Sequence, residues 1–248
     1  MDARSDHIVR RLRELGRVDV STLATELDAS EVTIRRDLEA LAAAGVLRRV
    51  HGGAVSLMLR GEDLPFALRE QADVEVKDRI ARAAVALVTD GEAVIVDSGT
   101  TGLAVARALV GRRLTVVPMS LPSAALLVAS PATTVKLTGG TASHGEGALV
   151  GPLADATLRS LRVDTVFVTC CGVNLVDGIM AYDDTEAVTK RTAMTSARRR
   201  VLVAEAAKLR RSALAVIGPL TDVDVLVTDA PRSAVAEIED AGVEVLRV

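Results

Sequence analysis

From residue 74 onward, short apolar runs rich in valine alternate with segments whose apolar residues recur at helical spacing. Buried strands that alternate with helices are typical of a largely parallel sheet covered on both faces. The pattern therefore predicts an α/β domain for most of the chain. We expect strands at 93–96, 114–117, 134–137, 165–169, 201–203, 214–216, 223–227 and 243–246, and helices at 76–88, 103–109, 149–158, 185–197 and 233–241.

The first 57 residues have a different texture. Apolar residues at helical spacing predict helices over 8–15, 20–27 and 31–44, and the residues 46–55 predict a strand, a tight turn and a second strand. Two short helices joined by the polar turn 28–30 have the geometry of a helix-turn-helix, with Ser30 as the N-cap of the second. The buried stripe of that helix is expected to be Val32, Ile34, Leu38 and Leu41.

The segment between these two regions follows neither pattern. Gly61, Glu62, Asp63 and Pro65 favour a linker or an irregular crossing. We therefore expect a small helical domain over 1–57, a linker over 58–75 and an α/β domain over 76–248.

Composition disfavours one class of binding module. The aromatic side chains are Phe66, Phe167 and Tyr182, and tryptophan is missing. A module that stacks bases or sugar rings needs several aromatic faces, which this chain cannot supply. The core must therefore be built from alanine, valine and leucine.

The cysteines and the lengths of the apolar runs argue against disulfide-rich, metal-binding and membrane-spanning proteins. Cys170 and Cys171 are adjacent, and neighbours in one strand point to opposite faces, so we expect buried, unreactive thiols and no metal site. From the charged first residues we expect no secretory signal. No run of about 18 apolar residues occurs, so we expect no membrane span and a cytoplasmic protein.

The helix predicted over 31–44 divides its residues as a DNA-reading helix does. Its buried stripe fixes the helix, while Thr33, Arg35 and Arg36 are expected on the exposed side. Arg48, Arg49 and His51 follow on the predicted ribbon, where they can reach phosphates. The alternative is plain helix packing, since residues 1–56 contain nine arginines and nine acidic residues and are not basic overall.

The residues 97–102 follow the predicted strand 93–96 and open the next helix. Backbone amides at a helix start, a glycine and several hydroxyls suit a phosphate group, although an ordinary strand-to-helix turn has the same composition. The residues 145–151 lack the sixth-position glycine of a dinucleotide fingerprint, and no Gly-Lys-Ser or Gly-Lys-Thr occurs, so we expect no nucleotide cofactor. Glu186 and Lys190 are either an exposed ion pair or part of the anion site, together with Lys208.

The amino-terminal motifs resemble the winged helix-turn-helix of the DeoR-type (GlpR-like) bacterial transcriptional regulators. The resemblance lies in the runs 20–24, 30–38 with Thr-Ile-Arg-Arg-Asp-Leu, and 49–54 with Arg-Val-His-Gly-Gly-Ala. One departure is Ala29, where the family usually has valine. The resemblance implies operator DNA as a partner and the following DNA-binding residues: Ser21, Ser30, Thr33, Arg35, Arg36, Arg48, Arg49, His51 and Gly52.

The carboxyl-terminal motifs are similar to the sensor domain of the same family, which is related to pentose phosphate isomerases and amino-sugar phosphate deaminases. The family usually has aspartate and serine where this chain has Glu205 and Ala207, which bears on which effector binds. The resemblance implies a phosphorylated sugar or related metabolite as effector. It would contact Asp97, Ser98, Gly99, Thr100, Thr101, Gly139, Gly140, Gly172, Glu186, Lys190 and Lys208.

Three functional hypotheses follow. The first is a DNA-binding repressor of a carbohydrate operon, a homodimer or homotetramer that places two recognition helices about 34 Å apart, or a multiple of that, and is controlled by the effector. The second is a sugar-phosphate isomerase or deaminase in which Asp97, Glu186 or His144 moves a proton. The third is a regulator whose pocket is vestigial and which responds to a partner protein.

Overall fold

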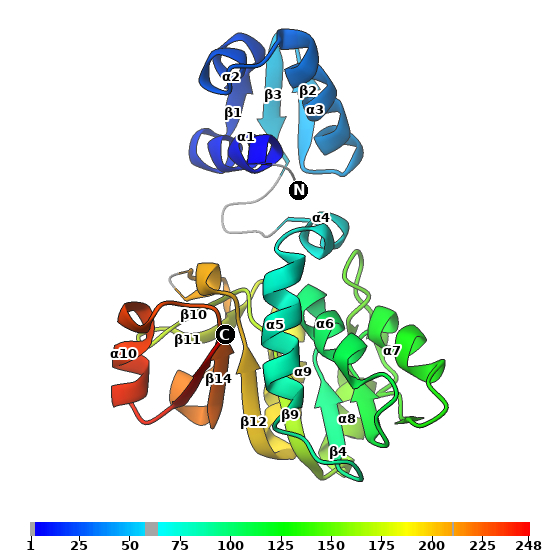
Figure 1. Cartoon of the computed structure of the whole chain (residues 1–248). Coiled ribbons are helices and arrows are strands. Elements are labelled where there is room, and N and C mark those ends of the chain that lie inside the picture. The colour runs from blue at the N-terminus through cyan, green and yellow to red at the C-terminus, as the bar shows by residue number, and fades with distance from the viewer. Residues whose placement is uncertain (1–2, 58–63, 210) are drawn as a thin grey trace. The chain divides into compact units, whose positions relative to one another are not determined.

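The computed structural model describes residues 3–57, 64–209 and 211–248. The chain divides into two compact units, Met1–Ala72 and Asp73–Val248, each described by itself below (Figure 1). The boundary between the units falls inside the segment expected as a linker. That segment also contains a short helix, α4 (Phe66–Gln71), which the sequence analysis did not anticipate.

The first unit contains the three expected helices, α1 (Ala3–Leu15), α2 (Val20–Glu26) and α3 (Glu31–Ala43). The strands β2 (Leu47–Val50) and β3 (Gly53–Ser56) form the expected ribbon. A third strand, β1 (Arg17–Asp19), pairs antiparallel with β3 and was missed. It has three residues and a single buried side chain, too little to produce a readable alternation.

The core of the first unit joins α3 to its neighbours, and it corrects one prediction. Ile34 and Leu38 are fully buried and Leu41 is nearly so, as expected, but Val32 is 59% exposed. At about 100° per residue, Val32 lies roughly 200° around the helix from Ile34 and therefore points away from the stripe. Its apolar character suggested burial that the helical geometry does not allow.

The second unit is built on a seven-stranded sheet in which every neighbouring pair is parallel, as predicted. Its order is β15-β14-β12-β9-β4-β5-β6. The strands are β4 (Ala93–Val96), β5 (Thr115–Pro118), β6 (Thr134–Val135), β9 (Val163–Val168), β12 (Ala197–Val203), β14 (Val225–Thr228) and β15 (Glu244–Arg247). The helices are α5 (Val74–Val85), α6 (Gly99–Leu109), α7 (Leu121–Val128), α8 (Pro152–Ser160), α9 (Asp184–Thr195) and α10 (Arg232–Asp240), with the 3-10 turns η1 (Ala206–Lys208) and η2 (Leu220–Asp222).

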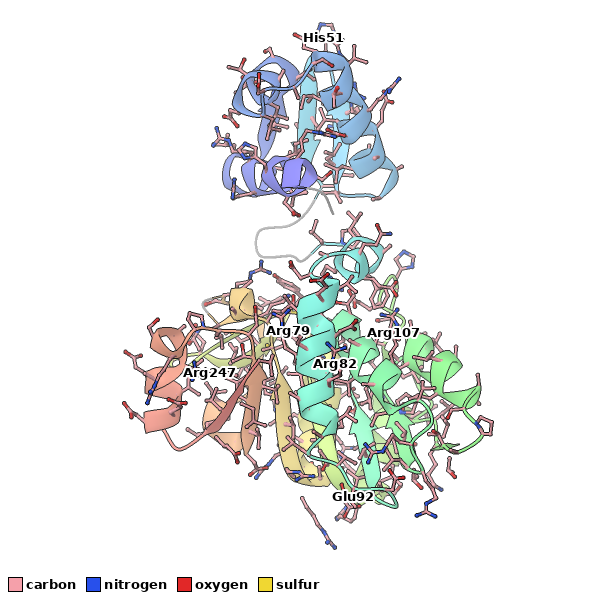
Figure 2. All side chains as sticks on the ribbon, in the orientation of Figure 1. His51, Arg79, Arg82, Glu92, Arg107 and Arg247 are labelled. Atoms are coloured by element: carbon pink, nitrogen blue, oxygen red, sulfur yellow. The ribbon has the colours of Figure 1, made fainter. Side chains whose placement is uncertain are left out.

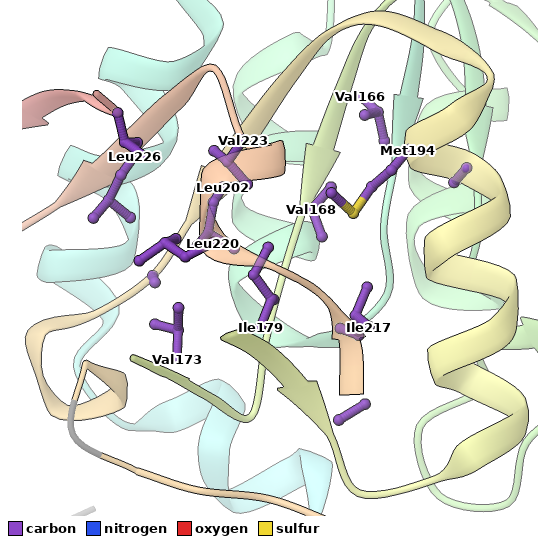
Figure 3. Close-up of a cluster of buried hydrophobic side chains, with 14 of the residues drawn as sticks. Val166, Val168, Val173, Ile179, Met194, Leu202, Ile217, Leu220, Val223 and Leu226 are labelled. Carbon is purple, nitrogen blue, oxygen red and sulfur yellow. The ribbon is translucent and has the colours of Figure 1, made fainter. Parts of the chain in front are cut away.

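Hydrophobic clusters cover both faces of this sheet. Successive residues of β9 contribute to opposite clusters: Phe167 packs with residues of α5, α6 and α7, whereas Val166 and Val168 pack with residues of α8, α9 and α10. Figure 3 shows the second cluster around Val166, Val168 and Leu202. The alternation of side chains along a strand thus accounts for the continuous apolar runs in the sequence.

A small antiparallel sheet adds to the second cluster. Its strands are β10 (Gly172–Asn174), β11 (Gly178–Ala181) and β13 (Ala215–Gly218), in that order. The segment 214–216 was expected in the parallel sheet, but β13 pairs with β11 instead. Val216 is 48% exposed while Ile217 is buried, so this strand is buried on one face only.

Three further local predictions are corrected. The helix expected over 149–158 begins at Pro152, because Leu149–Val150 forms β8, which pairs with β7 (Thr141–Ala142). The eight-residue helix α7 was missed. Cys170 and Cys171 lie beyond the end of β9 and are half-buried. The pKa of the Cys170 thiol is nevertheless raised to about 12 by burial of its sulfur.

The strand order reverses between β4 and β9. From β4 the chain adds β5 and β6 on one side, and then β9, β12, β14 and β15 on the other. In open α/β sheets, ligands bind at the carboxyl ends of the strands where the order reverses. The topology therefore directs attention to the residues that directly follow β4 and β9.

The contrast within α3 yields a stability prediction. Leu38→Ala leaves a cavity in the core of the first unit and should lower its free energy of unfolding by about 2–5 kcal/mol. Val32→Ala, on the exposed side of the same helix, should change it by less than about 0.5 kcal/mol. Hydrogen exchange of the α3 amides in the intact chain measures both values, and equal losses would contradict the assigned faces.

Candidate functional site

The start of α3 is organised by two hydroxyl groups. The Ser30 Oγ accepts a hydrogen bond from the Thr33 backbone N–H at 3.1 Å and lies 2.9 Å from the Thr33 Oγ1. Ser30 is thus the N-cap that the sequence predicted. Both hydroxyls are engaged with one another, so their first role is to fix the beginning of the helix.

The two neighbouring arginines of α3 differ in their surroundings. The Arg35 guanidinium donates to the Glu31 carboxylate at 2.6 Å, one turn earlier on the helix. Arg36 is exposed and makes no hydrogen bond or ion pair with any described residue. Neighbouring residues of an α-helix point about 100° apart, so the two side chains do not share the same surroundings. Arg36 is therefore the arginine of this pair that is available to an external anion or base.

The ribbon contains residues of two kinds. Arg49 on β2 donates to the backbone carbonyl of Arg35 at 3.3 Å and to the Glu39 carboxylate at 3.1 Å, so it fastens the ribbon to α3. Arg48 and His51 are exposed and make no such bond within the described parts of the chain. Figure 2 shows His51 at the end of the ribbon, beside Gly52, which has a φ of +74°. Ser21 lies exposed on α2.

In the second unit, Asp97 directly follows β4 and is buried. One carboxylate oxygen, Oδ2, accepts from the Lys190 Nζ at 2.6 Å and from the Thr169 backbone N–H at 2.9 Å. The other, Oδ1, accepts from the Ser98 backbone N–H at 2.7 Å. Thr169 directly follows β9, so this network lies where the strand order reverses.

Lys190 is the cation of this network. Its side chain is 5% exposed, and its Nζ also donates to the Thr169 Oγ1 at 3.0 Å. Burial opposes its charge, but the Asp97 and Glu186 carboxylates outweigh burial and raise the pKa of Lys190. The exposed Glu186–Lys190 pair that the sequence left open does not form, because Lys190 is buried and pairs with Asp97.

Glu186 lines the same small space as Asp97 and Lys190. Its carboxylate accepts from the Ser143 hydroxyl at 3.4 Å, and its backbone N–H donates to the Asp183 N-cap of α9 at 2.8 Å. Burial raises the pKa of Glu186, Lys190 lowers it, Asp97 raises it, and the net shift is upward. The ionised form of Glu186 is therefore disfavoured here, and a hydrogen-bond donor or a proton would stabilise this carboxyl group.

Two glycines bring backbone close to this region. Gly99 has a φ of +85°, and a Cβ there would lie 3.7 Å from the Thr169 hydroxyl. A Cβ on Gly140, with a φ of +95°, would lie 2.5 Å from the Val150 carbonyl oxygen. Gly140 therefore lets the loop after β6 approach the start of α8. Gly139 is exposed, and Gly172 packs against the Arg211 carbonyl on the small sheet.

The start of α6 is held by a contact from the end of β12. Thr100 and Thr101 are buried in the first turn of α6, and the Thr101 hydroxyl donates to the Glu205 carboxylate at 2.8 Å. The N-cap residue Ser98 makes no side-chain cap bond. Lys208 lies partly exposed on η1, where its charge acts on the Cys170 thiol.

The space among these residues is small. It measures about 140 Å³ including open solvent and has almost no room for a water molecule. Of the predicted effector residues, Asp97, Ser98, Glu186 and Lys190 line it, and Thr189 and Met119 line it as well. Thr169 and Thr189 are not among the residues that the sequence predicted for this site. Thr169 could have been found as the last residue of the predicted strand 165–169, whose carboxyl end meets that of 93–96 if the two strands are neighbours.

The Asp97–Lys190 pair yields a prediction about stability and pH. Lys190→Met leaves a buried carboxylate unpaired and should lower the free energy of unfolding by about 3–5 kcal/mol, whereas Asp97→Asn combined with Lys190→Met should cost less. The raised pKa of Lys190 adds stability that is present below its unfolded pKa of about 10.4 and is lost as the pH rises through the folded value. Urea unfolding between about pH 10 and 12 should therefore show a steeper loss in the natural chain than in the double variant. Parallel curves would contradict this.

Comparison with known proteins places the chain in a family. Residues 4–58 match the DeoR-like helix-turn-helix domain, and residues 72–230 match the DeoR C terminal sensor domain. The HTH-type transcriptional regulator GlpR of Haloferax volcanii is 32% identical over 245 residues, 98% of this chain and 96% of that protein. The glycerol-3-phosphate regulon repressor of Haemophilus influenzae is 31% identical over 239 residues, 96% of this chain and 93% of that protein.

Among solved structures, ribose 5-phosphate isomerase A from Methanocaldococcus jannaschii is similar to part of this chain. The match covers 56% of this chain and 55% of the isomerase chain, with 17% identity and a TM-score of 0.42. That likeness is too slight to bear on function. No described helix is long and apolar enough to cross a lipid bilayer. The two domain matches and the two near full-length relatives confirm the resemblance noted in the sequence, and the chain belongs to the DeoR family of transcriptional regulators.

Proposed function

We propose that this regulator is a repressor of a carbohydrate-metabolism operon, which binds operator DNA through α3 and the β2–β3 ribbon and responds to a phosphorylated metabolite bound beside β4 and β9. The observation that carries the effector part is the Asp97–Thr169–Lys190 network at the reversal of strand order. As a member of a regulator family the chain is not an enzyme, so the isomerase or deaminase alternative is set aside.

The DNA part is supported by the distribution of paired and unpaired basic side chains. Arg36, Arg48 and His51 are exposed and unpaired among the described residues, and they come from a helix and a ribbon that Arg49 joins. Ser21 and Gly52 lie exposed on α2 and in the ribbon turn. Phosphate contacts position a protein on DNA, and contacts in the major groove read sequence. Two copies of the unit in a homodimer or homotetramer would supply the two half-site contacts.

The effector part is supported by the mixture of groups at the site. The amino-terminal end of α6 and the ammonium groups of Lys190 and Lys208 suit a phosphate. The carboxylates of Asp97 and Glu186 suit the hydroxyl groups of a sugar or polyol, which donate hydrogen bonds. A phosphorylated sugar or polyol carries both kinds of group. The relative from Haemophilus influenzae is named for glycerol-3-phosphate, a molecule of this class.

Ligand entry requires rearrangement in this proposal. Lys190 is already bonded to Asp97, the Thr101 hydroxyl is bonded to Glu205, and the space is about 140 Å³. A bound metabolite would compete for Lys190 and widen the site. The conformation that binds the metabolite would then differ from the unliganded one, which is the requirement for an effector that shifts a population.

One prediction of the proposed function concerns affinity for DNA. Arg36→Ala should weaken binding to the operator by about 5- to 150-fold, the range for loss of a base contact. Arg48→Ala should weaken binding to all duplexes and reduce the salt dependence by about one ion, because it removes a phosphate contact. Fluorescence anisotropy with fragments of the intergenic region next to the gene measures both effects over a series of salt concentrations.

The matched control is Arg82→Ala, an exposed arginine of α5 in the second unit. It should leave the affinity unchanged. A loss as large as that of Arg36→Ala, or binding that does not depend on salt, would contradict the assigned surface.

Another prediction concerns binding of the effector. A phosphorylated sugar at 100 times its dissociation constant should stabilise the chain by about 2.7 kcal/mol, and the same sugar without phosphate should not. Lys208→Met should reduce the shift, because it removes one of the two ammonium groups. A thermal-shift screen of paired phosphorylated and unphosphorylated sugars and polyols tests this. If no compound shifts the unfolding temperature, the pocket is vestigial and the effector part of the proposal is wrong.

A further inference from the structure

Val32 is the one large apolar side chain of α3 that the described residues leave exposed, with 59% of its surface open. It is the second residue of the helix. Its polar neighbours are occupied: the Ser30 and Thr33 hydroxyls lie 2.9 Å apart, and Glu31 and Arg35 form an ion pair of 2.6 Å. Val32 does not belong to the hydrophobic cluster that the described residues of this unit form, so packing within that cluster does not account for it.

We propose that Val32 packs against the C5-methyl group of a thymine in the major groove and so reads one base of the operator. The inference rests on the proposed binding of DNA by α3. The first residues of such a recognition helix face the base edges. Among the groups that base pairs present in the major groove, the thymine methyl is the apolar one. A valine at this position therefore selects thymine.

Arg36 indicates where that thymine should lie. Val32 and Arg36 are four residues apart, so they share one face of α3 and are separated along the axis by about 5.4–6 Å. Successive bases of one strand are about 3.4 Å apart. The thymine should therefore lie within about two base pairs of the position that Arg36 contacts.

Two properties of the local structure suit this role. The Glu31 carboxylate is paired with Arg35, which offsets its repulsion of phosphates next to Val32. Valine is β-branched and holds one strongly preferred χ1 rotamer in a helix, so little side-chain freedom remains to be lost on contact. The contact is thus preorganised in the unbound protein.

The test uses uracil, which is thymine without the methyl group. A duplex is first selected from random-sequence DNA with the intact chain, and each of its thymines is then replaced singly by uracil. The natural chain should lose about fourfold in affinity at one thymine per half-site, the equivalent of one buried methyl group. Val32→Ala changes both copies in a dimer, so it should bind the selected duplex about as weakly as the natural chain binds a duplex with uracil at that position in both half-sites. It should not distinguish thymine from uracil there. Val32→Ile should keep the preference.

The controls separate this inference from the proposed function. Leu15→Ala, a similarly exposed apolar residue at the end of α1, should keep the natural response to uracil. Binding that loses nothing at any uracil, or a Val32→Ala variant with the natural response, overturns the role of Val32 while DNA binding stands. A Val32→Ala variant that instead changes the oligomeric state in sedimentation overturns it in favour of contact with a second copy. Failure to select any duplex overturns the proposed function itself.

Discussion

The buried ion pair between Asp97 and Lys190 is the interaction on which the candidate effector site depends. An ammonium group that is 5% exposed is stable there because the Asp97 carboxylate and the Thr169 hydroxyl surround it. Both of these residues directly follow strands, and the strands are neighbours only because the sheet order reverses between them. The topology thus creates a charged site that no single segment of the chain could form.

The DNA-binding unit uses charge in a related way. Residues 1–56 contain nine arginines and nine acidic residues, which argues against a general attraction to nucleic acid. The structure pairs Arg35 with Glu31, and Arg49 with Glu39, and leaves Arg36 and Arg48 unpaired among the described residues. The acidic residues therefore hold the helix and the ribbon in place, and the unpaired cations define the face that meets DNA in the proposed function.

Control by a metabolite would also depend on which charged groups are already paired. While the Lys190 ammonium group donates to the Asp97 carboxylate at 2.6 Å, its charge is already partly neutralised and it can bind a phosphate only weakly. Under the proposed function, a ligand that takes over part of this bonding would change the balance of charges between β4, β9 and α9 and would favour a conformation with a wider site. Any difference in DNA affinity between the open and closed conformations then appears as a coupling between effector and operator.

The sequence by itself determined the division into a small helical domain and an α/β domain, and it also determined the Ser30 cap, the strand 93–96 and the family. All of these depend on local periodicity or on contiguous motifs. It identified Asp97 and Lys190 separately, but not as partners, since 93 residues separate them and strand order is not encoded in any one segment. The prediction for Val32 was wrong because it followed the residue's apolar character and not the helical geometry, which places Val32 roughly 200° around the helix from Ile34. Only the tertiary structure decided that 214–216 joins the small antiparallel sheet and that Thr169 completes the site, since both depend on which strands become neighbours.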